Sequence, residues 1–386
     1  MKNKCFVFTF FALAFGLGMR LACAADSPQF PENATFNTLA KTPLAIEGLT
    51  GDDAGNLYTV GRNAGAGVSC PVWRTNLASG SLVVVGFIPA PSTTGQCSPS
   101  GLAFNTFGDL FIADGDRISF FTPNSVSPPT ATVYATGVPG TNGVAFDREG
   151  SLWTGDGVTG QGRVWRIPPG GGVAEEIFRI QPMTNSTGLG GKVPAPGVGR
   201  ANTTIPTGSA QNLVSNGIAF NHQADMFIID TARGALWKVQ FDPQGNLQSP
   251  TRCDSTFTDN TLCLSNVFVA HPILEGGDGI ALDVAGNIWV DANERNAVAV
   301  VTKDGKVREI FRNPPDTTTK LRNRGPLEFP TSPFLSGNQF CTANSDGDRR
   351  DNSPNGAGEI PAGPDVGKIS CMEPELIIKG LSLPVH

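Results

Sequence analysis

Six polar residues, most of them followed directly by glycine, are the positions in this 386-residue chain best suited to chemistry. Each opens a short apolar run, and they are Glu47, Ser100, Asn142, Asn216, Asp278 and Ser332. Carboxylate and amide oxygens are hard ligands of the kind that Ca²⁺ takes, and two carboxylates would balance a divalent charge. No His or Cys occupies these positions, which disfavours zinc or copper. The pattern predicts a divalent metal site, with Ca²⁺ the best fit, held by Glu47, Asn142, Asn216 and Asp278.

Each of these residues begins the same pattern of apolar strand, polar turn and second apolar strand. The clearest copy has strands at 218–220 and 226–229 around a turn at 221–225. Alternating β-branched and aromatic residues predict strands, and Gly- or Asn-rich gaps predict hairpins. Third and fourth strands follow in several copies, as at 163–167 and 174–178. Four antiparallel strands repeated six times predict an all-β fold, a six-bladed β-propeller.

The first strand of each propeller blade lines the central channel, so the six polar positions should converge around the axis. Converging polar groups must be satisfied by water or a metal. Ser100 and Ser332 are predicted to bind substrate or a metal-bound water, although an ordinary channel-lining hydroxyl is the simpler alternative. For the two Asn-Gly pairs the alternative is turn geometry, because Asn-Gly is a common turn dipeptide.

The N-terminus has the pattern of an export signal. Lys2 and Lys4 precede an apolar run at 6–19, and Ala22-Cys23-Ala24 offers a cleavage site of small residues. Residues 1–24 are therefore predicted to be a signal peptide and 25–386 the propeller. A lipoprotein anchor at Cys23 is the less favoured alternative, because Arg20 stands where an apolar residue is expected. The protein is expected to be secreted or periplasmic.

Six of the eight cysteines lie beyond the predicted signal, and an even number in an exported chain suggests three disulfides. Six cysteines allow fifteen pairings, and pairing between neighbours is favoured because each bond would staple one repeat. That pairing joins Cys70 to Cys97, Cys253 to Cys263 and Cys341 to Cys371.

Composition excludes some classes of function. The formal net charge of −6, without long runs of one sign, argues against a nucleic-acid partner. No apolar stretch beyond the leader is long enough to cross a bilayer. Residues 181–214 lack periodicity and are predicted to be a long surface loop or a lid. Either 34–44 or 375–381 could supply the outer strand that closes the ring.

The repeat and its four oxygen-bearing positions resemble the SMP-30/gluconolactonase/LRE-like family, relatives of the paraoxonases and of squid-type diisopropyl fluorophosphatase. That family takes a catalytic divalent metal from a first-blade Glu, third- and fourth-blade Asn and a fifth-blade Asp. The resemblance implies these roles for Glu47, Asn142, Asn216 and Asp278. The chain departs from the family pattern at Leu49, where Pro is frequent, and around Asn142, which lacks the nearby Asp and Arg associated with sugar lactones.

The resemblance implies a Ca²⁺-dependent hydrolase of lactones or related esters, with Asp278 as general base or nucleophile. One alternative is a non-catalytic propeller that binds a protein or glycan and keeps a structural metal. Another is a relative of the strictosidine-synthase-like or streptogramin-lyase propellers, but the lyases need a histidine at the channel. His222 and His271 lie off the first positions and near no G-x-S-x-G motif, which disfavours a serine hydrolase. The segment 344–351 imitates a calcium loop incompletely, and a solvated acidic loop is favoured there.

Overall fold

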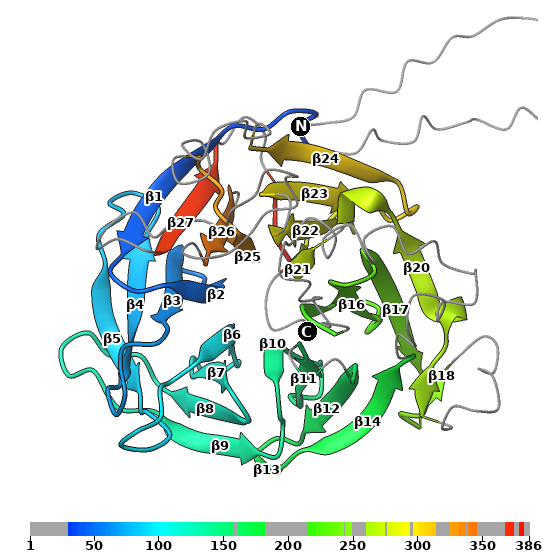
Figure 1. Ribbon diagram of the computed structural model, residues 1–386. Helices are drawn as coiled ribbons and strands as arrows, with labels where there is room; N and C mark the ends of the chain where they lie inside the picture. The colour runs from blue at the N-terminus through cyan, green and yellow to red at the C-terminus, as the bar shows by residue number, and fades with distance from the viewer. Residues whose placement is uncertain are drawn as a thin grey trace, which may run out of the picture.

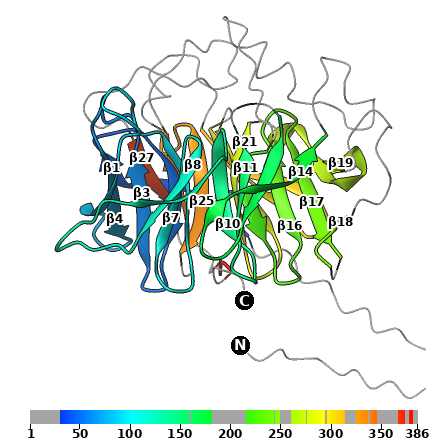
Figure 2. The same cartoon turned by 90° about the horizontal axis from the view of Figure 1, so that it is seen from below.

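Six antiparallel sheets surround a central axis in the computed structural model and form a closed ring (Figure 1). The predicted six-bladed β-propeller is confirmed. The structure describes residues 30–157, 159, 161–181, 215–242, 244–248, 260–274, 276–293, 296–313, 325–336, 339–345, 367–373 and 378–381. Seen from the side, the strands of neighbouring blades stand next to one another in a single layer (Figure 2).

The first three blades run in chain order from the inner to the outer strand. Blade 1 contains β2 (Ile46–Gly51), β3 (Asn56–Gly61), β4 (Cys70–Asn76) and β5 (Val83–Ile88). Blade 2 contains β6 (Pro99–Phe104), β7 (Leu110–Asp114), β8 (Arg117–Phe121) and β9 (Thr132–Thr136), with β13 (Gly172–Val173) parallel to β9. Blade 3 contains β10 (Thr141–Phe146), β11 (Leu152–Asp156), β12 (Arg163–Ile167) and β14 (Glu175–Ile180), with β19 (Thr261–Leu262) parallel to β14.

The other three blades complete the ring. Blade 4 contains β15 (Ile218–Phe220), β16 (Met226–Asp230) and β17 (Ala235–Phe241), and β18 (Leu247–Gln248) and β20 (Val267–Ala270) both pair with β17. Blade 5 contains β21 (Gly277–Leu282), β22 (Ile288–Ala292), β23 (Ala297–Val301) and β24 (Val307–Arg312). Blade 6 contains β25 (Pro330–Ser336), β26 (Gln339–Asn344), β27 (Gly367–Met372) and β1 (Phe36–Thr42). Two 3₁₀ turns are η1 (Leu264–Asn266) and η2 (Pro272–Leu274).

A side-chain turn repeated from blade to blade explains the Asp or Asn that follows each inner strand. Asp283 Oδ1 accepts hydrogen bonds from the backbone N–H groups of Ala285 and Asn287, both at 2.9 Å. Its other oxygen accepts one from Trp289 Nε1 at 3.0 Å. Such turns fix the hairpin between the first two strands of a blade. The same backbone pattern recurs at Asp52, Asn105 and Asn221.

The N-terminal strand closes the ring. β1 pairs with β27 in an antiparallel register from Phe36 opposite Met372 to Thr42 opposite Gly367. Of the two segments that could supply the outer strand, the structure therefore uses the first. The C-terminal tail instead lies against blade 5, where Gly380 bridges Asp283.

Two of the three predicted disulfides are present, Cys70–Cys97 and Cys341–Cys371. The second of these joins β26 to β27 within the closing blade. The third predicted bond includes Cys253, which lies outside the described residues. The predicted signal peptide, residues 182–214 and most of the acidic segment 344–351 also lie outside them. Within the described part of the chain, no helix has the length and hydrophobicity needed to cross a bilayer.

Ring closure predicts a large effect for one aromatic residue of β1. Phe36 is 3% exposed and packs against Phe311 and Phe340, at ring-centroid distances of 4.9 and 5.9 Å. We expect Phe36→Ala to lower the free energy of unfolding by about 3–5 kcal/mol, because it leaves a cavity at the seam of the ring. Chemical denaturation measures this change.

Phe107, which is 87% exposed, supplies the matched control. Phe107→Ala should change stability by less than about 0.5 kcal/mol, as surface substitutions usually do. Equal losses of unfolding free energy in Phe36→Ala and Phe107→Ala would contradict closure of the ring through β1.

Candidate functional site

The glycines of the repeat allow the inner strands to approach one another at the axis. A Cβ atom on Gly143 would lie 2.6 Å from the carbonyl oxygen of Asn216, and one on Gly217 equally close to that of Asp278. Neither glycine has a positive φ, so close approach and not turn geometry requires glycine there. The Asn-Gly pairs are thus parts of the axial ring and not tight turns.

Hydrogen bonds between neighbouring blades hold the inner strands at this separation. The N–H of Gly217 donates to the carbonyl oxygen of Asp278 at 2.8 Å. Ser100 Oγ donates to the carbonyl oxygen of Asn142 at 3.3 Å, and Thr331 Oγ1 to that of Glu47 at 2.6 Å. These contacts link blades 4 and 5, 2 and 3, and 6 and 1, and they bring the first positions of the repeat into one ring.

Blade 6 departs from the register that its sequence suggested. Pro330 pairs with Asn344 and Pro333 with Thr342, so two residues of β25 oppose one residue of β26, as in the bulges of blades 1, 2, 3 and 5. Thr331 therefore occupies the first position and Ser332 the position that glycine holds elsewhere. A Cβ atom on Gly279 would accordingly meet the carbonyl oxygen of Thr331 at 2.5 Å.

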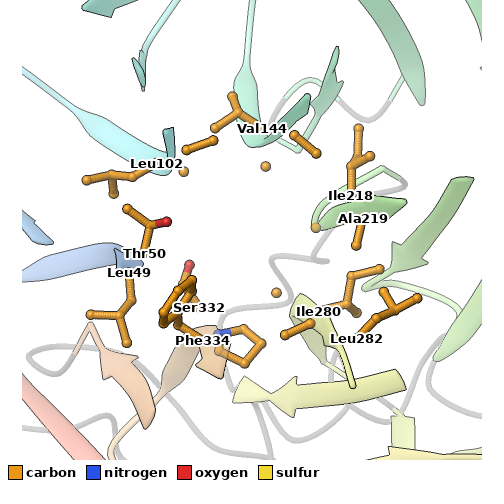
Figure 3. Close-up of a pocket in the computed structure, with 18 of the residues that line it drawn as sticks. Leu49, Thr50, Leu102, Val144, Ile218, Ala219, Ile280, Leu282, Ser332 and Phe334 are labelled. Atoms are coloured by element: carbon orange, nitrogen blue, oxygen red, sulfur yellow. The ribbon is translucent and has the colours of Figure 1, made fainter. Parts of the chain in front are cut away.

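Ser332 instead lines a cavity of about 120 Å³ on the axis (Figure 3). Residues that follow the first positions surround this cavity, and they include Leu49, Leu102, Val144, Ile218, Ile280 and Phe334. None of the four predicted metal ligands lines it. The axis therefore has two zones, a polar ring at the start of the inner strands and a more apolar cavity farther along them.

Glu47 is held by an arginine that the sequence argument missed. Arg62 forms an ion pair with Glu47 Oε2 through Nη1, and the two side chains are only 15% and 10% exposed. Arg62 Nη2 also donates to Ser98 Oγ at 3.1 Å. Asn142 Nδ2 donates to Glu47 Oε1 at 3.1 Å, which joins two of the predicted ligands directly. The signal for Arg62 was its place one residue after β3, at the same end of the blade as Glu47.

Asn216 and Asp278 occupy adjacent inner strands and differ in how their oxygens are satisfied. Asn216 is 1% exposed, and its Nδ2 donates to Thr231 Oγ1 at 3.1 Å. Its Oδ1 is buried and accepts no hydrogen bond. Asp278 is 5% exposed and accepts a hydrogen bond from Asn293 Nδ2 at 2.8 Å. The carbonyl acceptor of Asn216 thus lacks a partner at the very position predicted to bind a cation.

A second buried carboxylate, also missed from the sequence, lies close to Asp278. Asp291 is fully buried, and the hydroxyl of Thr342 donates to its Oδ2. Burial raises the pKa of Asp291 well above its usual range, and the charge of Asp278 raises it further, while the Thr342 hydrogen bond lowers it.

The ring residues fit a divalent cation in donor type and burial. Oxygen-bearing side chains from blades 1, 3, 4 and 5 occupy buried first positions, and the Oδ1 of Asn216 accepts no hydrogen bond there. Glu47 fits less simply, because Arg62 already compensates its charge. No group of three or more His, Cys, Asp and Glu side chains suited to a metal occurs in the described residues.

Neither described histidine belongs to the ring. His222 lies in the turn between β15 and β16, where its carbonyl oxygen accepts a hydrogen bond from Arg148. His271 follows β20, and its Nδ1 accepts one from the N–H of Ile273 at 3.1 Å. These two residues therefore place no imidazole group at the axis.

The fold is a closed six-bladed propeller whose inner strands carry oxygen-bearing side chains at their first positions. Residues 199–325 match the SMP-30/Gluconolactonase/LRE-like region, which confirms the resemblance to that family over the segment with Asn216 and Asp278. None of the curated protein sequences compared matches the chain.

Three solved structures illustrate the fold. A calcium-binding regucalcin from Agrobacterium tumefaciens shares 19% identity, with 90% of this chain and 96% of that one covered and a TM-score of 0.56. A gluconolactonase from Xanthomonas campestris shares 15% identity, with 88% and 89% covered and a TM-score of 0.51. The PQQ-bound aldose sugar dehydrogenase of Streptomyces coelicolor shares 14% identity, with 89% and 99% covered and a TM-score of 0.55. At these identities the likeness shows the architecture, and the function must be argued from the site.

The Arg62–Glu47 pair predicts a measurable coupling without metal. In the presence of a chelator, Arg62→Met should destabilise the protein by about 3–5 kcal/mol, because it leaves a mostly buried carboxylate without its counter-charge. The double variant Arg62→Met/Glu47→Gln should recover much of that loss. A double-mutant cycle by chemical denaturation measures the coupling, and additive effects of the two substitutions would contradict the pairing.

Proposed function

We propose that this protein is a divalent-cation-dependent hydrolase of lactones or related esters, with Ca²⁺ as the preferred ion. The carrying observation is the buried Oδ1 of Asn216, which accepts no hydrogen bond in a ring that also contains Glu47, Asn142 and Asp278. A carbonyl oxygen kept without a donor costs free energy, and a cation bound by the ring offsets that cost. The family match over 199–325 and the gluconolactonase-like architecture support the choice of substrate class.

The roles of the chain's own residues follow from their contacts. Glu47, Asn142, Asn216 and Asp278 would hold the divalent cation, which would supply Lewis-acid polarisation of the substrate carbonyl. Asp278, oriented by the hydrogen bond from Asn293, accepts a proton from water. The water oxygen bonds to the carbonyl carbon, the ring C–O bond breaks, and Asp278 returns the proton to the alkoxide leaving group to give a hydroxy acid.

Ser100 is the better placed of the two serines proposed to contact substrate. It lies in the ring, is 4% exposed, and directs its hydroxyl proton at backbone carbonyls of blade 3. Its oxygen therefore remains an acceptor. Ser332 lies in the second zone of the axis, so its proposed role is restricted to a substrate group that reaches the cavity.

Export is part of the proposal. The Lys2 and Lys4 start, the apolar run and the small-residue cleavage site indicate a signal peptide. The disulfides Cys70–Cys97 and Cys341–Cys371 are compatible with an oxidising extracellular or periplasmic compartment.

The proposal predicts that mature protein binds Ca²⁺ or a similar ion and hydrolyses members of a panel of lactones and esters. Asp278→Ala and Asn216→Ala should each remove ion binding, measured by isothermal titration calorimetry, and lower kcat/KM at least about 100-fold, as loss of a general base does. Ser332→Ala, with the same loss of a polar group outside the ring, is the control and should retain ion binding.

Two outcomes would contradict this proposed function. Turnover that persists unchanged in chelator and in Asp278→Ala would place the chemistry elsewhere. Ion binding without turnover of any panel member, with Ca²⁺, Mg²⁺, Mn²⁺ and Zn²⁺ supplied in turn, would favour a non-catalytic propeller with a structural metal.

A further inference from the structure

Asp291 is a charged residue in a place where the propeller repeat otherwise puts small or apolar ones. The strand registers align it with one residue from the second strand of every other blade. Those residues are Val60, Ala113, Gly155, Ile229 and Ala343. The repeat therefore does not need a carboxylate at this position to build a blade.

The surroundings of Asp291 do not compensate its charge. It is fully buried, its Oδ2 accepts from the neutral hydroxyl of Thr342, and its Oδ1 accepts no hydrogen bond. It forms no ion pair with any residue that the structure describes. In the sheet it lies opposite the bulge formed by Asp278 and Gly279, so the two carboxyl-bearing residues face each other across one pair of strands. Burying a carboxylate in this way is costly unless a positive charge arrives.

Asn293, beside Asp278 and Asp291, also has a buried acceptor without a hydrogen bond. Asn293 is 1% exposed, its Nδ2 contacts Asp278 at 2.8 Å, and its Oδ1 accepts no hydrogen bond. The blade 5 side of the ring therefore collects negative charge and unsatisfied acceptors. On the blade 1 side, in contrast, Arg62 compensates Glu47.

We infer that Asp291 is a positioning residue that supplies the second negative charge for a divalent cation bound at Asp278, in place of the neutralised Glu47. Asn293 orients Asp278, and Thr342 orients Asp291 across the interface between blades 5 and 6. This inference rests on the proposed cation site. It changes which residues balance the charge of the ion, and it makes blade 5 the centre of that site.

The test is calcium titration of the mature protein by calorimetry, together with thermal unfolding in chelator and in saturating Ca²⁺. Asp291→Asn keeps the shape of the side chain and removes only its charge, so it should weaken Ca²⁺ binding about 10–100-fold, the usual range for partners of metal ligands. Without the ion the same variant should unfold at or above the wild-type temperature, because it removes a buried carboxyl group whose charged form no neighbouring residue compensates. Added Ca²⁺ should stabilise it less than wild type.

Asp283→Asn is the matched control, since Asp283 is 2% exposed and lies in the same blade but fixes the β21–β22 turn. It should lower the unfolding temperature and leave the Ca²⁺ affinity unchanged.

Wild-type affinity in Asp291→Asn, with binding lost in Asp278→Asn, would overturn the role of Asp291 and leave the cation site standing. An unfolding temperature lowered in Asp291→Asn as in Asp283→Asn would also overturn it. Absence of binding to wild type would overturn both proposals.

Discussion

The close approach of six inner strands at one axis is the constraint on which the rest of this structure depends. A backbone without Cβ atoms is needed where neighbouring strands nearly touch, and Gly143 and Gly217 meet that need. Once the strands are this close, whatever side chain precedes each glycine must share a small, buried space with its counterparts. The first position of the repeat is therefore where polar chemistry concentrates, while the later positions of the same strands form the more apolar cavity.

Electrostatics within that space is uneven around the ring. Blade 1 contributes a carboxylate that Arg62 already neutralises, whereas blade 5 contributes Asp278 beside the buried Asp291. The amide oxygens of Asn216 in blade 4 and Asn293 in blade 5 accept no hydrogen bond. An arrangement of this kind costs stability in the free protein, and such costs are typical of sites built to receive a ligand.

The sequence predicted the fold well because the same strand–turn–strand pattern recurs along the chain. Alternating strands, glycines and the Asp or Asn turn residues recur in the first five copies, so one blade such as that of Asn216 supports the interpretation of the others. The register of blade 6 could not be derived, because Ser332 follows Thr331 where the other copies have glycine, so no glycine marks the first position. The sequence also left open whether β1 or the C-terminal tail closes the ring, since both segments have strand-like composition.

The sequence drew attention only to those residues of the candidate site that follow the repeat. Glu47, Asn142, Asn216 and Asp278 stand at the repeat's first position, but Arg62, Asp291 and Asn293 come from second strands or the residues just after them. Nothing in a single sequence shows which of many charged residues will face the axis. Their importance arises from burial and from partners on other blades, such as Thr342 opposite Asp291.

Anomalous diffraction from crystals of the mature protein grown with Mn²⁺ as a stand-in for Ca²⁺ tests the central claim most directly. The account predicts one strong peak on the axis, within coordination distance of Asn216 Oδ1 and a carboxylate oxygen of Asp278, at about 2.1–2.6 Å as expected for oxygen ligands. A ring that stays free of anomalous density at saturating ion, with Asn216 Oδ1 bonded only to water, would contradict it.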